Sequence, residues 1–502
     1  MLVTISLLVS AVAAAYIYLV WNFNYWKKRH VPGPDPKPLV GNFPAFILRT
    51  RTVMEEMDEI YNDYKAKYNF VGVFSNRSPR ILITCPALAK DILTKHFRSF
   101  HDNEFGEFTE SAGDAGLIGR SPFFLNGDKW KAKRAEITPA FTTSRMKALF
   151  PIVEFVSTSM SAYIVKNRNS ELDARELAAK FTTDVVSSCI FDTDAQSFTN
   201  EKAQIREMGR RLTNSSFTAF VTMMLLSTCP KLAKMLNIGS GVKKVEQFFI
   251  DLMSEAAMYR EKNGTKRVDY LEHLISLRNE KQITEVDMAA HGVTFFFDGF
   301  ETSSVVMSFI LYELARNPTV QTRLREDCSK ASNDQGTISY EDLLELPYLE
   351  QVINETLRLW PVGPFLSKTC TEPVDLELCP GQSVRIEPGV CAVIPFGGIH
   401  RDPQFYQDPL TFNPDRFSPE TGGVNPYREM GCFMPFGEGP RQCLGMRFAR
   451  MQMKRAIYEV VKNFELSVSD KTVQPLRMDP KQLFTAAVGG IWLNFEPILE
   501  QS

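Results

Sequence analysis

The chain lacks the features that would place it in a disulfide-rich, nucleic-acid-binding or disordered class. Its nine cysteines are an odd number and form no C-x-x-C pair, which argues against a disulfide framework and a zinc ribbon. The formal net charge is only −2, so no nucleic-acid partner is expected. With 44% hydrophobic and 23% charged residues, the composition is globular. We therefore expect a folded protein of a reducing compartment, in which most cysteines are small buried apolar residues.

Two kinds of functional motif are also missing. The six histidines show no metal-ligand spacing, and we interpret each as structural or exposed. The chain has no Rossmann glycine fingerprint and no flavin-binding region. Electrons for any redox reaction must therefore come from another protein.

Charged side chains are absent from residues 1–26. The apolar run from Leu2 to Trp21 matches the ~20 residues that a helix needs to cross a bilayer. Aromatic residues that favour the membrane interface gather at its end, and three basic residues follow. These aromatic residues are Tyr16, Tyr18, Trp21, Tyr25 and Trp26. We predict a single-pass transmembrane signal-anchor over 1–26, with the rest of the chain on the cytoplasmic side. A cleaved signal peptide, the alternative, would need positive charge before the apolar run.

Residues 27–38 combine a basic stop with a proline-rich strap. Four prolines between Pro32 and Pro38 favour a stiff, extended backbone. We interpret this segment as a spacer between membrane and protein, and a linker of no specific role is the alternative. Residues 39–502 contain no repeat and no clean linker, so we expect one further domain.

Helical periodicity dominates that domain. Strands are expected at 71–74 and 80–84, helices between 128 and 317 and at 340–359, a last long helix after Cys443, and short strands within 464–498. The predicted fold class is therefore mainly α with a minor β region.

The segment from Phe436 to Gly445 reads Phe-Gly-Glu-Gly-Pro-Arg-Gln-Cys-Leu-Gly. A cysteine at the mouth of a helix is pushed towards the thiolate by the helix dipole and free N–H groups. Gly439 and Gly445 allow the backbone and a flat ligand to approach closely, and Arg441 offers a charge for a carboxylate. A structural cysteine in a glycine-rich turn would leave this joint placement unexplained.

This segment resembles the haem-binding signature F-x-x-G-x-R-x-C-x-G of the cytochrome P450 family. Other segments match the family in its order, so the resemblance covers nearly the whole chain, and the N-terminus resembles that of microsomal members. It implies the family fold, a helical domain plus a small β domain behind a transmembrane anchor, with 39–502 as the haem-thiolate catalytic domain. The cofactor would be haem b, with Cys443 as the axial iron ligand. Phe436, Gly439, Arg441 and Gly445 would complete this binding segment.

Two further motifs support the resemblance. Glu355 and Arg358 share one helix face, and Arg416 follows in Phe412–Phe417, so the resemblance implies a buried Glu–Arg–Arg network of structural role. Trp130 and Arg134 are i, i+4 neighbours that can reach one carboxylate, and the family uses such a pair for a haem propionate. Lys368 falls where a basic residue often does the same, with a solvated lysine as an equal alternative.

A long apolar helix is predicted from 286 to 316, with Thr284 and Asp287 as a capping box. Gly299 in mid-helix costs ~1 kcal/mol against alanine, and the Thr302 hydroxyl can bond the carbonyl four residues back. A polar kink in a core helix is one interpretation. The resemblance implies instead that Glu301 and Thr302 form the catalytic acid–alcohol pair that relays protons for oxygen activation. Asp298 departs from the Ala or Gly usual in the family.

Several segments are expected to line the substrate pocket by resemblance, with ordinary core packing as the alternative. They are Phe105–Phe124, Phe217–Leu226, the helix face with Phe296 and Phe300, Val362–Leu366 and Phe484–Val488. Such Phe- and Met-rich surfaces suit apolar ligands. Residues 217–226 are also expected to dip into the bilayer.

The resemblance implies a monooxygenase of the endoplasmic reticulum (microsomal) membrane, most like insect members of xenobiotic and hormone metabolism. It would use NADPH through NADPH-cytochrome P450 reductase, with cytochrome b5 as an optional partner and a small lipophilic substrate. An isomerase or dehydratase on the same fold and a non-enzymatic membrane haem sensor are the alternatives. Glu301 and Thr302 favour the oxygenase.

A basic docking surface for the reductase is predicted from two helices. Its members are Lys129, Lys133, Arg447, Arg450, Lys454 and Arg455. An ordinary solvated face is the alternative.

Overall fold

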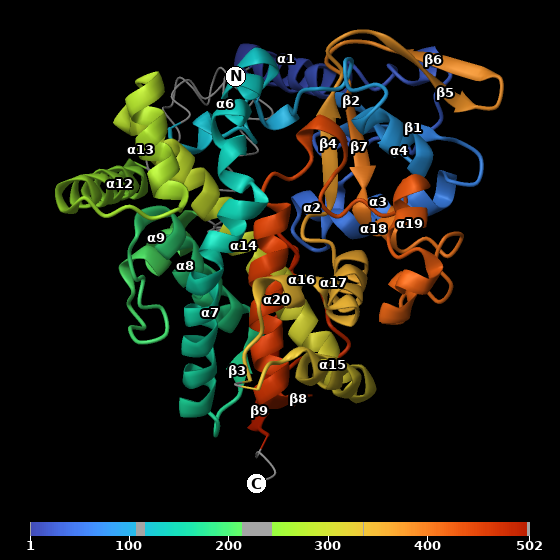
Figure 1. The fold of residues 1–502 in the computed structure, drawn as a ribbon. Helices are drawn as coiled ribbons and strands as arrows, with labels where there is room; N and C mark the ends of the chain where they lie inside the picture. Colours follow the sequence, from blue (N-terminus) through green and yellow to red (C-terminus); the bar gives the residue numbers. More distant parts are fainter. Residues whose placement is uncertain (1, 107–115, 213–242, 335, 499–502) are drawn as a thin grey trace.

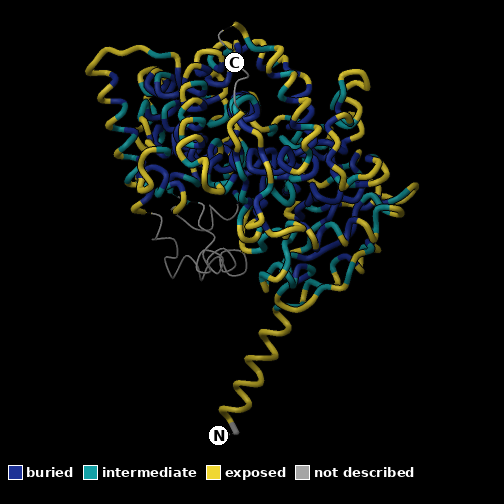
Figure 2. Tube along the Cα trace, turned by 90° about the horizontal axis from the view of Figure 1, so that it is seen from below, coloured by how far each residue is buried: buried dark blue, intermediate teal, exposed yellow. Residues whose placement is uncertain are grey.

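The computed structural model describes residues 2–106, 116–212, 243–334 and 336–498. Helix α1 (Leu2–Val20) projects alone from the body, as Figure 2 shows. Among the described residues three helices are long and apolar enough to cross a membrane: α1, α7 (Thr143–Lys166) and α14 (Glu285–Arg316). Since α7 and α14 pack inside the body and α1 is unburied, α1 is the candidate anchor.

Residues 26–41 are part of the folded body. Trp26 is only 3% exposed, and its indole N–H donates to the carbonyl oxygen of Val73 at 3.2 Å. The Gly72 N–H donates to Pro32 O at 2.8 Å, and a Cβ added at Gly33 would lie 1.9 Å from Gly72 O. Placing Trp26 among interfacial aromatic residues was therefore wrong, because the hydrophobic gain of burying its ring lies in the protein core.

The β region is small (Figure 1). One sheet has the order β1 (Phe70–Ser75), β2 (Ser78–Ile83), β7 (Cys391–Pro395) and β4 (Phe365–Thr369), with only β2 and β7 parallel. The hairpin β5 (Val374–Cys379)–β6 (Gln382–Ile386) extends beside it. The third sheet joins β3 (Leu172–Asp173), β9 (Trp492–Pro497) and β8 (Phe464–Val468).

Helices form the rest of the body, and α14 lies at its centre (Figure 1). The elements around α14 are α8 (Ala174–Phe191), α12 (Lys243–Asn263), α13 (Tyr270–Lys281), α15 (Pro318–Ala331), α17 (Pro347–Leu359) and α20 (Met446–Asn463). The outer helices are α2 (Pro44–Ile47), α3 (Val53–Tyr64), α4 (Pro86–Leu93), α6 (Gly127–Ile137), α9 (Gln204–Leu212), α16 (Tyr340–Glu345), α18 (Phe396–His400) and α19 (Asn425–Glu429). The mainly α class with a minor β region is confirmed.

Two predicted helices can be judged at their ends. The capping box of α14 is confirmed, since Asp287 N donates to Thr284 Oγ1 at 3.1 Å and the Asp287 carboxylate accepts from Thr284 Oγ1 at 2.7 Å. The single helix predicted over 340–359 is two helices, α16 and α17, which meet at Leu346. Pro347 causes the break, because it disfavours helical backbone at the preceding residue and starts the second helix.

Candidate active site

Cys443 lies in the loop that leads into α20. Its N–H donates to the carbonyl oxygen of Phe436 at 2.9 Å, which closes the loop. At Gly439 φ is +71°, and an added Cβ would lie 2.0 Å from Leu93 O. Glycine is therefore required at this point of the loop.

The Cys443 side chain opens onto an internal space. The residue is exposed, yet burial within the body raises the pKa of its thiol to about 11. The charge of Asp298 raises this pKa too, and the N–H groups of Gly445 and Met446 only partly offset the rise. The predicted effect of the helix terminus is present, because these N–H groups lower the pKa of the thiol, but burial outweighs it. A coordinated metal ion would supply the missing positive charge.

The middle of α14 contributes a stripe to an internal space. From Met288 to Ala315 every residue is buried except Phe297, Asp298, Gly299 and Thr302, which we call the accessible stripe. Because α14 is surrounded by other elements, this access must be from inside the body. The charge of Asp298 raises the pKa of the Cys443 thiol, so the two groups lie near each other.

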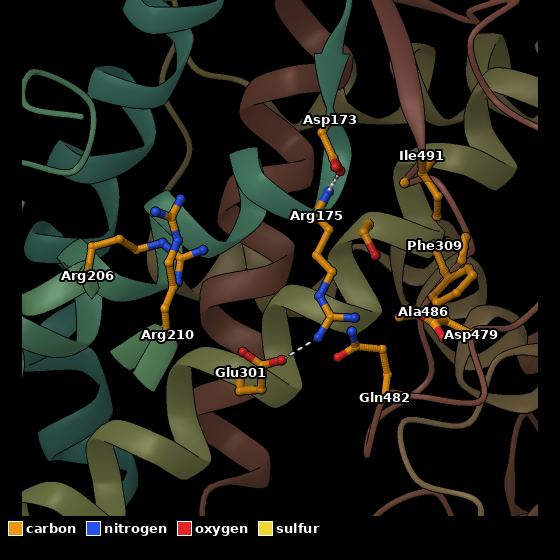
Figure 3. A pocket seen from close by; sticks show the side chains of 13 residues that line it. Asp173, Arg175, Arg206, Arg210, Glu301, Phe309, Asp479, Gln482, Ala486 and Ile491 are labelled. Carbon is orange, nitrogen blue, oxygen red and sulfur yellow. Dashed lines mark hydrogen bonds and ion pairs between the residues drawn. The ribbon is translucent and has the colours of Figure 1, made fainter. Parts of the chain in front are cut away.

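Glu301 and Thr302 are directed to different surroundings. The Thr302 hydroxyl donates to the Asp298 carbonyl oxygen at 2.6 Å, which confirms the predicted back-bond and leaves its oxygen on the stripe. Glu301 is buried and forms an ion pair with Arg175 at the start of α8. Figure 3 shows this pair inside a polar cavity of about 290 Å³, next to Arg206 and Arg210.

Arg175 was not predicted from the sequence. It lies 126 residues before Glu301, and no local pattern links the two positions. Its guanidinium also donates to the carbonyl oxygen of Thr485 at 3.4 Å, and its backbone N–H donates to Asp173 at 2.8 Å. Arg175 thus ties α14 to the loop before β9.

Trp130, Arg134, Lys368 and Arg441 form a group that we call the basic cradle. The Arg441 guanidinium lies 4.2 Å from the centre of the Trp130 ring, and Arg134 donates to Gln442 O at 2.7 Å. Burial lowers the pKa of Arg134. Burial, reinforced by the charge of Arg441, lowers the pKa of Lys368 to about 7.

Positive charge exceeds negative charge in the basic cradle. Burial lowers the pKa of Arg441 to about 10, and its carboxylate neighbour is Asp102 at 3.5 Å. No partner of the Trp130 indole N–H is found within the described part of the chain. A ligand with two carboxylates would offset this charge and accept that N–H, so the cradle fits haem propionates.

The predicted Glu–Arg–Arg network is present and buried. Glu355 accepts from Arg358 at 2.7 and 2.8 Å and from Arg416 Nε at 3.2 Å. Asn413 N also donates to it at 3.0 Å, and Arg358 reaches His400 O at 3.0 Å. Each oxygen of the carboxylate is thus hydrogen-bonded, and the network ties α17 to the segment that carries Arg416.

Three of the segments predicted as pocket walls meet at one cavity, and their role towards a substrate stays a prediction. Phe105, Phe365 and Phe484 line an apolar cavity of about 190 Å³. Phe296 and Phe300 do not belong to it, because both are fully buried in an aromatic cluster with Phe249 and Phe191. This face of α14 belongs to the core, and the accessible stripe lies on the neighbouring face of the same helix. Residues 217–226 lie outside the described residues.

The predicted basic docking surface is largely wrong. Lys454 is 2% exposed and pairs with Glu350 at 3.0 Å, while Arg450 pairs with the same carboxylate. Arg455 is also buried and paired. The helical spacing was correct, but α7 and α16 pack against α20, and Glu350 of α17 and Glu154 of α7 pair with its basic residues.

The part of this surface that remains accessible is smaller. Lys133 is paired with Glu136 at 3.0 Å. Lys129 and Arg447 are exposed and form no ion pair within the described ranges. The same holds for Lys131, which was not among the predicted members.

The profile of the family described as Cytochrome P450 matches residues 31–493. A Drosophila melanogaster protein described as probable cytochrome P450 28a5 is 36% identical, over 99% of this chain and 100% of its own length. Cytochrome P450 6a2 of the same species is 36% identical over 99% and 100% of the two chains. Cytochrome P450 6k1 of Blattella germanica is 33% identical over 97% and 96%.

Proposed function

Because the chain belongs to the cytochrome P450 family of haem monooxygenases, we propose that it is a membrane-anchored member that oxidises small lipophilic compounds. It inserts one oxygen atom from O2 and uses NADPH electrons delivered by a separate reductase. The observation that carries the proposal is the joint opening of Cys443 and the accessible stripe onto an internal space, with surplus buried positive charge beside it.

The described residues fit haem b. When bound, the haem supplies the redox chemistry that activates oxygen. Cys443 would hold the haem iron through its sulfur, and the basic cradle would hold the propionates. An added Cβ at Gly445 would meet nothing within 4 Å, so the backbone there leaves room for a flat ring. Phe436 and Gly439 keep the loop in shape, and the Glu355 network braces it from behind.

Proton transfer is assigned to Thr302 and Glu301. The Thr302 hydroxyl donates its proton to Asp298 O, so its oxygen can still accept a hydrogen bond from a donor in the internal space. Glu301 borders the polar cavity of Figure 3, where Arg175 fixes its carboxylate. We assign this cavity as the source of the protons that Glu301 passes towards Thr302.

The membrane attachment is assigned to α1. Its 19 residues span about 28 Å at 1.5 Å per residue, close to the thickness of a bilayer core. The proposed location is the endoplasmic reticulum membrane, with the body on the cytoplasmic side. Deleting residues 2–20 should release the protein from vesicles in a flotation assay with its haem spectrum intact. A deletion that also removes Trp26 should destabilise the body.

The function is tested with purified protein, NADPH-cytochrome P450 reductase and lipid vesicles. Substrate-dependent NADPH consumption with one oxygen atom from labelled O2 in the product is the expected result. Conversion of peroxides without NADPH would support the isomerase alternative, and haem binding without either reaction would support the sensor alternative. Cytochrome b5 is added in a second series as an optional electron donor.

A further inference from the structure

Asp298 differs from the other acidic residues of α14 in the partners of its side chain. Glu285, Asp287, Glu301 and Glu313 each have a hydrogen-bond or ion-pair partner. Among the described residues Asp298 has neither, although its side chain lies in the middle of the central helix. A carboxylate inside the body without a hydrogen-bond or ion-pair partner costs free energy. A ligand that supplies such a partner would offset this cost.

The residue before Asp298 leads to an apolar surface. The Phe297 ring lies 6.3 Å from the ring of Phe484, which lines the apolar cavity. The one guanidinium on that cavity, Arg80, is already held by Glu104 at 2.6 Å. Burial alone raises the pKa of Asp298 to about 7, with no basic group among the described residues near enough to lower it.

The other cationic groups around the internal space already have a partner or belong to the basic cradle. Arg134, Lys368 and Arg441 belong to the basic cradle, and Arg175 is paired with Glu301. The accessible stripe therefore carries one unbalanced acidic group within an apolar surface. A ligand with an apolar body and one positive charge matches this pattern, because a nearby cation favours the ionised carboxylate.

We propose that Asp298 anchors substrates that carry a protonated amine on an apolar body, and so sets the substrate class of this site. The inference rests on the proposed function, in which the internal space receives the substrate. The family's usual Ala or Gly at this position would leave the same wall neutral. The amine pairs with the Asp298 carboxylate while the body of the substrate lies against the Phe297 and Phe484 side.

The test compares two probes that differ in charge alone. A phenylpropyl trimethylammonium ion carries a permanent charge and has no lone pair that could bind iron. Its neutral isostere has a tert-butyl head group of the same shape. Binding to the haem-loaded protein at about pH 8 is measured by equilibrium dialysis and by the shift of the Soret band. The variants are Asp298→Asn and Asp298→Ala, and Asp375→Asn on the exposed hairpin β5–β6 is the charge control.

The wild-type protein and Asp375→Asn should prefer the cation, and both Asp298 variants should lose at least about tenfold of that preference. The neutral probe should bind all four proteins alike, which shows that the site is intact. Equal affinity of the wild-type protein for both probes, or a preference that survives in Asp298→Asn, would overturn the inference while leaving the proposed function standing. If neither probe binds the wild-type protein, the placement of the substrate itself fails, and the inference fails with it.

Discussion

Glu355 and Asp298 are two carboxylates inside the same body, and their surroundings are opposite. Glu355 accepts hydrogen bonds from two arginines and a backbone N–H, and Glu355 and Arg358 are fully buried while Arg416 is half-buried. Asp298 has no partner within the described residues and faces an internal space. The first group ties α17 to the segment that carries Arg416 and reaches the Met434 N–H through His400, and the second leaves one carboxylate on the α14 side without a partner in the described part of the chain.

This difference matches what the two regions have to do. An axial ligand must stay in one position, so its loop is braced by a network that breaks only at high cost. A substrate site must accept a ligand, and its polar groups gain their partners only when the ligand binds. Replacements behind Cys443 should therefore damage the fold or the cofactor, and replacements on the accessible stripe should change reaction and selectivity.

The largest effect is expected at Cys443. Cys443→Ala should lose thiolate-ligated haem and all NADPH-driven turnover, because Cys443 is the one exposed cysteine among the described residues and the others are buried or half-buried. Haem content and product formation are the measurements. Cys379→Ala on the β5–β6 hairpin is the control and should behave as wild type. Turnover retained by Cys443→Ala would remove the proposed ligand.

The next largest effect is expected in the Glu355 network. Glu355→Gln leaves two buried guanidinium groups without their carboxylate, so the free energy of unfolding should fall by about 3–5 kcal/mol. Chemical denaturation and haem retention are the measurements. Glu377→Gln on exposed strand β5 is the matched control, with an expected change within about 0.5 kcal/mol. A loss confined to catalysis, with unchanged stability, would contradict a structural role.

Thr302 tests the other side of the comparison. Thr302→Ala should keep its haem spectrum and stability while the product formed per NADPH falls by about tenfold, because the proton-relaying hydroxyl is gone. The missing electrons should appear as peroxide or water. Thr302→Ser keeps the hydroxyl and should restore most of the product. A ratio equal to wild type in Thr302→Ala would mean that the residue only loosens the helix.

The smallest effect is expected on the outer surface. Lys131→Glu combined with Arg447→Glu should slow reductase-driven turnover several-fold at low salt, since opposite charges mainly speed encounter and salt screens them over ~8–10 Å. Peroxide-supported turnover bypasses the reductase and should be spared. Lys454→Glu should reduce both activities, because it puts a charge of the wrong sign beside Glu350. If the Lys131→Glu, Arg447→Glu protein turns over as fast as wild type with the reductase at low salt, the docking surface lies elsewhere.

The sequence predicted the parts of the molecule that depend on local patterns. The capping box of α14, the back-bond of Thr302 and the strands after Asn463 follow from residues close together in the chain. The Glu355 network was predicted by resemblance, although its third member lies 61 residues away.

Long-range packing limited the rest of the prediction. The burial of Lys454 and the pairing of Arg175 with Glu301 depend on helices that are distant in sequence, and helical spacing cannot show which face another helix covers. Trp26 was assigned to the membrane interface because an aromatic ring suits both environments, and only its bond to Val73 separates them. The balance of burial and backbone N–H groups at Cys443 also required the three-dimensional surroundings.

The most direct test of the central claim is the absorption spectrum of the reduced protein with carbon monoxide bound. A thiolate ligand from Cys443 predicts a long-wavelength Soret band in the wild-type protein and its absence in Cys443→Ser. A short-wavelength band in the freshly prepared wild-type protein, or an unchanged long-wavelength band in Cys443→Ser, would contradict the account.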